Sequence, residues 1–185
     1  MGFPAFLDTC VLFSPTLTDT LLRIAEEDAY APLWSPGVLA ELHTVLEREA
    51  GLTPAAAQRR ITHMDTAFPH ANVYGYDHLV DAMTCDPKDR HVLAAAITGG
   101  AEVLVTANLA DFPPASLAPH HVTASHPDEF LLDQLDLHPG KVRRALVGQL
   151  NASRRPPLTL GQLLGRLSRA GVPRFAEEAR RHEFA

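Results

Sequence analysis

Short apolar runs alternate with helical patterns along the first 135 residues of the chain. The apolar runs predict buried strands at residues 6–7, 31–34, 72–74, 103–105 and 121–124. The run at 103–105 is the clearest of the five, because it is short and rich in valine, as strands of parallel sheets are. The run at 72–74 gives a weak signal.

Helical spacing of apolar residues separates most of these runs. Ser35-Pro36 and Thr53-Pro54 each pair an N-capping side chain with a proline suited to a first helical turn, so a helix is expected to begin at each. Further helices are expected at residues 17–25, 88–98 and 128–135. Strands that alternate with helices predict an α/β fold, a three-layer α/β/α sandwich around a mostly parallel sheet.

The composition changes after residues 138–140, which read His-Pro-Gly. Amphipathic helical patterns follow at residues 141–150, 160–167 and 175–182. We therefore expect two units, a domain over residues 1–137 and a helical C-terminal extension over residues 138–185.

The formal net charge of −6 argues against a general nucleic-acid-binding protein, but the charge is unevenly distributed. Residues 1–137 carry 6 Lys and Arg against 19 Asp and Glu, whereas residues 138–185 carry 10 against 3. Two interpretations stay open. The extension either exposes a solvated basic face or supplies a basic arm beside an acidic site.

Several classes of protein are excluded by composition. Two cysteines without a CxxC pair are too few for a disulfide scaffold or a cysteine zinc site. No apolar stretch approaches the ~18 residues of a membrane span, and the first residues show no secretory signal pattern. We expect a cytoplasmic protein without a membrane association.

Acidic side chains stand at the predicted strand ends. Asp8 follows the first strand, Glu41 lies in the helix after the second, Asp89 begins the helix at 88–98, and Asp111 follows the strand at 103–105. Because ligands bind outside the carboxyl ends of parallel strands, these four acids are expected to converge at one edge of the sheet.

Each acid alone also has a structural explanation. Asp86 suits the N-cap of a helix that begins at Pro87, and a helical glutamate such as Glu41 is commonly solvated. Asp8 is different, because a carboxylate directly after a buried apolar pair costs free energy that needs a reason. Clustered carboxylates stay ionised together only beside a cation, and oxygen ligands favour Mg²⁺ or Mn²⁺. A metal held in this way is suited to phosphodiester hydrolysis.

Four blocks give the chain a family resemblance: FLDT at 6–9, AELHTVL at 40–46, DPKDRHVLAAA at 86–96 and LVTANLADFP at 104–113. In order and spacing they resemble PIN-domain ribonucleases, in particular the VapC-type toxins of bacterial toxin–antitoxin systems. The resemblance covers roughly residues 3–135. It implies a Mg²⁺-dependent endoribonuclease, with Mn²⁺ as a substitute metal. Products with 5′-phosphate and 3′-hydroxyl ends are expected, because direct attack by water does not need the ribose 2′-hydroxyl.

The resemblance also implies which residues act. Asp8, Glu41 and Asp89 would hold the metal, and the fourth ligand would be Asp111 or, through its amide oxygen, Asn108. Asp86 would support the ligands from outside, and two threonines, Thr9 and Thr106, would position ligands or phosphate.

Partners follow from the same resemblance. VapC-like toxins act on RNA, whether tRNA, rRNA or mRNA, form homodimers, and are silenced by an antitoxin protein that occupies the acidic cleft. The extension lies outside the usual PIN domain, and its arginines are expected to contact RNA phosphate or an acidic partner. These are Arg143, Arg144, Arg154, Arg155, Arg166 and Arg169.

Other signals give less. His91 is expected on a different helix face from Asp89, Trp34 in the core, and Cys10 and Cys85 as buried small apolar residues. Two other functions stay open. A degenerate PIN-fold module that binds RNA or protein finds its support in Asn108, which stands where many relatives carry aspartate. The other is a metal-dependent phosphatase or DNA nuclease on a similar α/β scaffold. No Asp-x-Asp pair follows the first predicted strand, which argues against the aspartyl-phosphate mechanism of such phosphatases.

Overall fold

A four-stranded parallel sheet forms the centre of the protein, whose computed structural model describes residues 2–153 and 156–182. The strands are β1 (Phe3–Leu7), β2 (Tyr30–Leu33), β3 (Val103–Val105) and β4 (Thr123–Ser125), in the order β2-β1-β3-β4. Every pairing between these strands is parallel, with Phe6 of β1 opposite Leu33 on one side and Leu104 on the other. The predicted α/β fold with a mostly parallel sheet is therefore confirmed.

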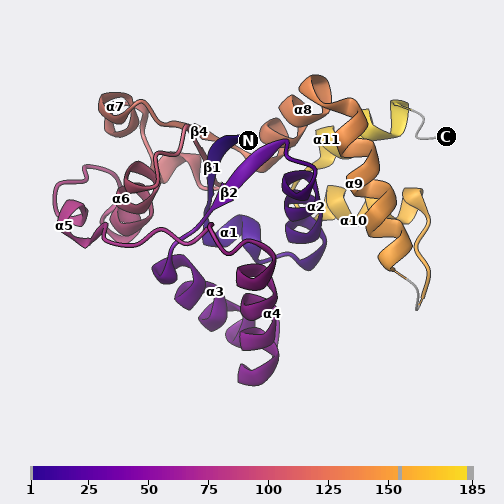
Figure 1. The fold of residues 1–185 in the computed structure, drawn as a ribbon, viewed down its shortest axis with the longest axis horizontal. Helices are drawn as coiled ribbons and strands as arrows, with labels where there is room; N and C mark the ends of the chain where they lie inside the picture. The colour runs from indigo at the N-terminus through magenta and orange to yellow at the C-terminus, as the bar shows by residue number, and fades with distance from the viewer. Residues whose placement is uncertain (1, 154–155, 183–185) are drawn as a thin grey trace.

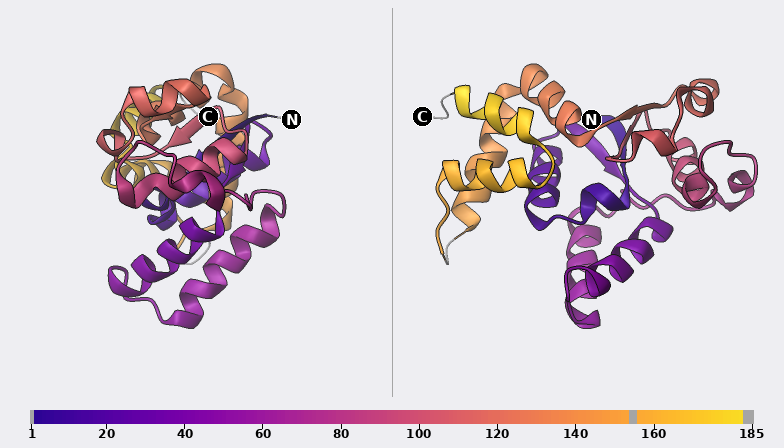
Figure 2. Two further views of the ribbon diagram at one scale, coloured as in Figure 1. Left: turned by 90° about the vertical axis from the view of Figure 1, so that its left-hand side faces the viewer. Right: turned by 180° about the vertical axis from the view of Figure 1, so that it is seen from behind.

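Helices cover both sides of the sheet (Figures 1 and 2). In Figure 1, α6 stands on one side, α2 and α8 on the other, and the α3–α4 pair projects beyond the carboxyl ends of the strands. The helices of the first 137 residues are α1 (Thr9–Leu12), α2 (Pro15–Glu26), α3 (Pro36–Arg48), α4 (Pro54–Ala67), α5 (Asp77–Val80), α6 (Arg90–Thr98), α7 (Pro114–Leu117) and α8 (Pro127–Leu137), with 3-10 turns η1 (Pro87–Asp89), η2 (Leu109–Asp111) and η3 (Ala118–His120).

Burial explains the central strands. Phe6, Leu7, Leu104 and Val105 are fully buried, so both middle strands are covered on both faces, as a sheet between two helical layers requires. Trp34 is also fully buried, as predicted, and its indole N–H donates to Asp65 Oδ1 at 3.2 Å. This packing fixes the strand ends that present the acidic residues.

The prediction of a strand at residues 72–74 is wrong. Only Asn72 pairs with the sheet, through a single bridge to Trp34, and the chain then leaves it. Tyr74 is exposed, and Gly75 takes a positive φ of 76° that turns the backbone away. The predicted strands at 31–34 and 121–124 are shifted by one or two residues from β2 and β4.

The C-terminal extension consists of α9 (Pro139–Ala152), α10 (Leu160–Arg169) and α11 (Pro173–Arg181). In the views of Figures 1 and 2 these helices gather beside α2 and α8. Asp128 of α8 joins the two parts, because its carboxylate accepts the backbone N–H groups of Arg174 and Phe175 at 3.2 and 2.8 Å. The domain boundary at 137/138 stays a prediction, and Arg154 and Arg155 lie outside the described residues. In the described part of the chain, no helix is both long and apolar enough to cross a bilayer.

Candidate active site

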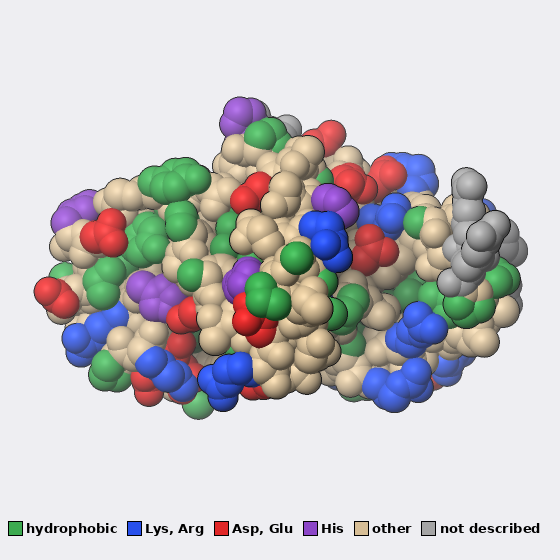
Figure 3. Space-filling model, turned by 90° about the horizontal axis from the view of Figure 1, so that it is seen from below, with side chains coloured by type: hydrophobic (Ala, Val, Ile, Leu, Met, Phe, Trp, Pro, Cys, Tyr) green, Lys and Arg blue, Asp and Glu red, His purple; other side chains and the backbone are tan. Residues whose placement is uncertain are grey.

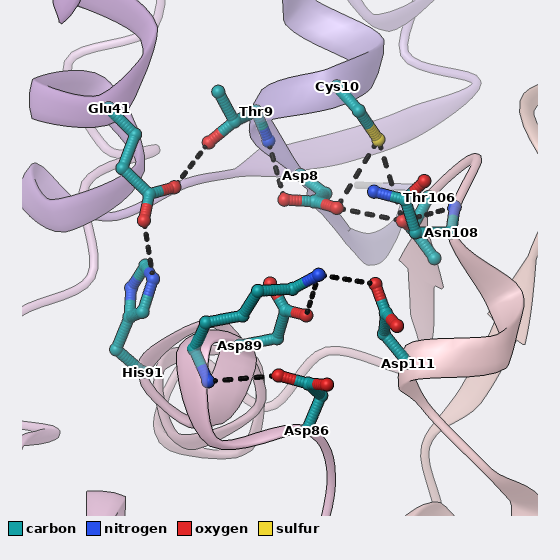
Figure 4. Close-up of polar contacts among 11 residues, drawn as sticks. Asp8, Thr9, Cys10, Glu41, Asp86, Asp89, His91, Thr106, Asn108 and Asp111 are labelled. Carbon is teal, nitrogen blue, oxygen red and sulfur yellow. Dashed lines mark hydrogen bonds and ion pairs between the residues drawn. The ribbon is translucent and has the colours of Figure 1, made fainter.

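A cleft of about 410 Å³ opens at the carboxyl ends of β1 and β3. The structure brings the four acids singled out in the sequence to this region from four separate segments (Figure 4). The described residues that line the cleft are Asp8, Thr9, Cys10, Phe13, Glu41, Val45, Glu49, Lys88, Asp89 and Asn108.

Asp8 is buried at the end of β1, with 5% of its surface exposed. Its Oδ1 accepts the N–H of Thr9 at 2.7 Å, which caps the short helix α1. Its Oδ2 accepts the hydroxyl of Thr106 at 2.7 Å and the thiol of Cys10 at 3.3 Å. These neutral donors fix the carboxylate, and none of them supplies a positive charge to balance it.

Glu41 reaches the cleft from α3 and is held at both oxygens. Thr9 donates its hydroxyl to Oε2 at 2.8 Å, and His91 Nε2 lies 2.9 Å from Oε1. Partial burial raises the pKa of Glu41, but the hydrogen bonds from His91 and Thr9 outweigh it and leave the pKa below its usual value. Glu41 is therefore an ionised, oriented carboxylate at neutral pH.

His91, expected on a different helix face from Asp89, has a partner in the site, the carboxylate of Glu41. Asp89 ends the 3-10 turn η1 and precedes the first residue of α6, so the two residues do not share one regular helix. In Figure 4 His91 points to Glu41, while Asp89 lines the cleft. The hydrogen bond to Glu41 raises the pKa of His91 against the effect of burial.

Asp89 and Asp111 share one cation, the ammonium of Lys88. Lys88 Nζ lies 3.2 Å from Asp111 Oδ2 and 3.8 Å from Asp89 Oδ2. At 3.8 Å this is an ion pair and no hydrogen bond, and Asp89 Oδ2 is buried without a hydrogen-bond partner. Burial, and after it the nearby carboxylates, outweigh Lys88 and raise the pKa of Asp89 to about 6.

Asp86 and Asn108 occupy supporting positions. Asp86 accepts the N–H of Lys88 at 3.1 Å as the N-cap of η1, and its own N–H donates to the carbonyl of Asp111 at 3.1 Å. Asn108 donates its backbone N–H to Thr106 Oγ1 at 3.0 Å and lines the cleft. Both Asn108 and Asp111 stay candidates for the fourth ligand.

Cys10 has a role in the site that the sequence did not indicate. The residue is half-buried, and besides donating to Asp8 its sulfur accepts the N–H of Ala107 at 3.3 Å. Burial, followed by the charge of Asp8, raises the pKa of Cys10 to about 11. The thiol therefore stays protonated and acts as a hydrogen-bond donor to Asp8.

The chemistry of these donors fits a hard divalent cation. Oxygen atoms of Asp8, Glu41, Asp89 and Asp111 face one region, and a buried oxygen of Asp89 has no hydrogen-bond donor. The Lys88 ammonium shows that positive charge is accommodated between two of them. Among residues 2–153 and 156–182, no three His, Cys, Asp or Glu side chains already form a closed metal-binding group. The acids would have to draw together to bind the ion.

None of the described arginines of the extension lines the cleft. Arg144 Nε pairs with Glu27 Oε2 at 2.6 Å, just beyond the end of α2, and no lining residue of the cleft comes from α9 to α11. In Figure 3 Lys and Arg side chains lie over the end of the molecule that carries the extension and also over the opposite end. A substrate-binding role for Arg143 and Arg144 stays a prediction, and it concerns a surface apart from the carboxylates.

Comparisons with known proteins agree with this architecture. A family model described as "PIN domain" matches residues 4–110, and one described as "VapC50 C-terminal domain" matches residues 127–181. The second match includes α8 as well as the extension. The chain is also 47% identical over 118 residues to a Mycobacterium tuberculosis (strain ATCC 25618 / H37Rv) protein named "Putative ribonuclease VapC50", covering 64% of this chain and 67% of that protein. No solved structure matches the chain.

Proposed function

The chain belongs to the PIN-domain family, and from this premise we propose that it is a divalent-metal-dependent endoribonuclease. The observation that carries the proposal is the convergence of Asp8, Glu41, Asp89 and Asp111 around one cleft. The relative's name describes a ribonuclease, which supports RNA as the substrate.

Asp8, Glu41, Asp89 and Asp111 would hold the metal, Mg²⁺ or Mn²⁺. When bound, such an ion supplies an activated water and charge stabilisation for phosphodiester hydrolysis. The chain's own residues orient the ligands. Thr106 and the Thr9 N–H fix Asp8, while the Thr9 hydroxyl and His91 fix Glu41. Asp86 holds the backbone of η1, from which Asp89 projects.

We further propose that the protein is the toxin of a toxin–antitoxin pair, a homodimer that acts on cytoplasmic RNA. The VapC50 name of its relative and the match of residues 127–181 support the toxin assignment, and the homodimer and the cytoplasmic location are part of the proposal alone. An antitoxin would reach the acidic cleft with a basic side chain, because Arg pairs well with carboxylates in partly desolvated sites.

Metal dependence and product chemistry test the proposal together. Purified, antitoxin-free protein is incubated with total cellular RNA in Mg²⁺, in Mn²⁺ and in EDTA, beside a single-stranded DNA of matched length. We expect discrete RNA fragments with 5′-phosphate and 3′-hydroxyl ends, because direct attack by water does not use the ribose 2′-hydroxyl. Fragments that form equally in EDTA, or that carry 2′,3′-cyclic phosphates, would contradict the mechanism.

A further inference from the structure

Lys88 is the one Lys or Arg among the described residues that line the cleft. Its ammonium lies between Asp111 at 3.2 Å and Asp89 at 3.8 Å, two of the proposed ligands. The side chain is nevertheless 66% exposed. The Lys88 ammonium therefore pairs with two acids at the cleft but remains accessible to solvent.

The backbone of Lys88 is fixed while its side chain has room to move. The N–H of Lys88 donates to Asp86 Oδ1 at 3.1 Å, and the residue is the middle one of η1. Among the described residues, the partners of its ammonium are the two carboxylates. A lysine side chain has several rotatable bonds, so the ammonium can leave them without any change in the fold.

Once a divalent cation and RNA bind, the cation repels the ammonium from its present position and an RNA phosphate attracts it elsewhere. An ammonium and a divalent cation cannot share Asp89 and Asp111 at contact distance, because like charges a few ångströms apart repel strongly. An incoming RNA also brings its phosphates to a cleft that otherwise presents acids, and a phosphate needs a positive partner there.

We propose that Lys88 is the phosphate-binding residue of the cleft, held by Asp89 and Asp111 until a divalent ion displaces its ammonium toward the RNA backbone. This inference rests on the function proposed above. It makes Lys88 both a competitor of the metal in the resting protein and a contact to substrate in the working one.

The alternative is that Lys88 forms an ordinary surface ion pair. Exposed pairs of this kind contribute little to stability, so replacing Lys88 is expected to leave the fold intact. The chain offers a matched control, because it contains one other lysine, Lys141, in helix α9 of the extension. Its ammonium donates to the carbonyl of Asp28 at 2.9 Å. Lys141→Gln removes the same charge from a surface outside the cleft.

The first measurement is Mn²⁺ affinity by calorimetry on the full chain, without RNA. Lys88→Gln is expected to bind Mn²⁺ about 30-fold more tightly than wild type, the effect of removing one positive charge at about 4 Å from a doubly charged ion in water. Lys141→Gln is expected to match wild type. Equal or weaker Mn²⁺ binding by Lys88→Gln would overturn the competition.

The second measurement is binding of a short 2′-O-methyl RNA oligonucleotide in Mn²⁺ over a salt series, with its integrity checked on a gel. Losing one phosphate contact should flatten the slope of log affinity against log salt by about 0.7 in Lys88→Gln, and not in Lys141→Gln. An unchanged slope in Lys88→Gln would overturn the phosphate contact. If wild type binds no Mn²⁺ and cuts no RNA, the proposed function itself fails. If wild type does both and only the Lys88 effects are missing, this inference alone fails.

Discussion

Asp89 carries an unfavourable charge in the metal-free protein. Its side chain is 17% exposed, and it lies close enough to Asp8 and Asp111 for their charges to raise its pKa in addition to the effect of burial. The Lys88 ammonium offsets this only in part. A site prepared to bind a cation is therefore destabilised until the cation arrives, a common conflict between stability and function.

Replacing Asp89 should relieve this repulsion. A folded-state pKa near 6, above the usual value of 3.8, means that the penalty is absent below pH 3.8, grows as pH rises, and is complete above pH 6. Asp89→Asn is therefore expected to raise the Tm of metal-free protein at pH 8 by a few degrees, for about 1 kcal/mol of relief, and by less at pH 5. Scanning calorimetry at the two pH values measures the difference. A lower Tm at pH 8 would contradict this account of the site.

His91 acts on Glu41 through a hydrogen bond, as a positioning residue. His91→Ala leaves Thr9 as the one partner of the Glu41 carboxylate among the described residues, so Mn²⁺ affinity is expected to weaken about tenfold, the usual cost of losing a group that orients a ligand. The matched control is His43→Ala on α3, where His43 pairs with Glu47 at 2.7 Å outside the cleft. Equal Mn²⁺ affinities for the two variants would refute the positioning role.

At the scale of elements, helix starts were the most predictable features. Ser35-Pro36 and Thr53-Pro54 begin α3 and α4 as predicted, and each cap accepts the N–H three residues on, Val38 for Ser35 and Ala56 for Thr53. Such signals are local, since the capping side chain and its partner lie within one turn. The strand edges were less predictable, because pairing with a neighbour decides where β2 and β4 begin and end.

Short helices were not predicted. The four-residue helix α1 contains too few residues to show a periodic pattern, and it exists because Asp8 caps it and its apolar side chains Val11 and Leu12 are buried. The same geometry places Cys10 against Asp8, which explains why the sequence did not indicate a role for Cys10. The acids could be singled out because they stand at strand ends, whereas the contacts of Lys88 and His91 depend on the turn η1.

The last helix of the extension, α11, is capped by a residue of another helix, α8. Val172, the N-cap residue of α11, makes no capping side-chain hydrogen bond, and Asp128 of α8 accepts the N–H groups of Arg174 and Phe175 instead. Asp128→Ala is expected to lower the free energy of unfolding by about 2 kcal/mol, at the upper end for lost caps, because Asp128 is buried. Urea denaturation measures the loss.

Glu129→Ala is the control for this prediction. Glu129 pairs with Arg174 at 2.6 Å, but both side chains are more than half exposed. An exposed ion pair is worth about 0–1 kcal/mol, so this variant should unfold close to wild type. A loss for Glu129→Ala equal to that for Asp128→Ala would show that surface charge, and not the buried cap, fastens α11.

At the scale of the whole molecule, the extension lies apart from the cleft, and two of its arginines pair with acids outside the cleft, Arg144 with Glu27 and Arg174 with Glu129. The carboxylates gather at the strand ends (Figure 4), while the extension packs beside α2 and α8 (Figure 1). The extension therefore enlarges the protein on a side other than the cleft. Lys88 is the one Lys or Arg among the described residues that line the cleft, and its ammonium lies beside Asp89 and Asp111.

Cleavage of cellular RNA in Mg²⁺ by carboxylate variants tests the central claim most directly. Asp8→Asn, Glu41→Gln, Asp89→Asn and Asp111→Asn are compared with wild type and with Asp77→Asn, which changes an exposed acid at the start of α5. Each of the four is expected to lose about 100-fold or more in rate, since each removes a charge that holds the metal, while Asp77→Asn stays at the wild-type rate. Full cleavage by folded Asp8→Asn would contradict the assignment of this cleft as the nuclease site.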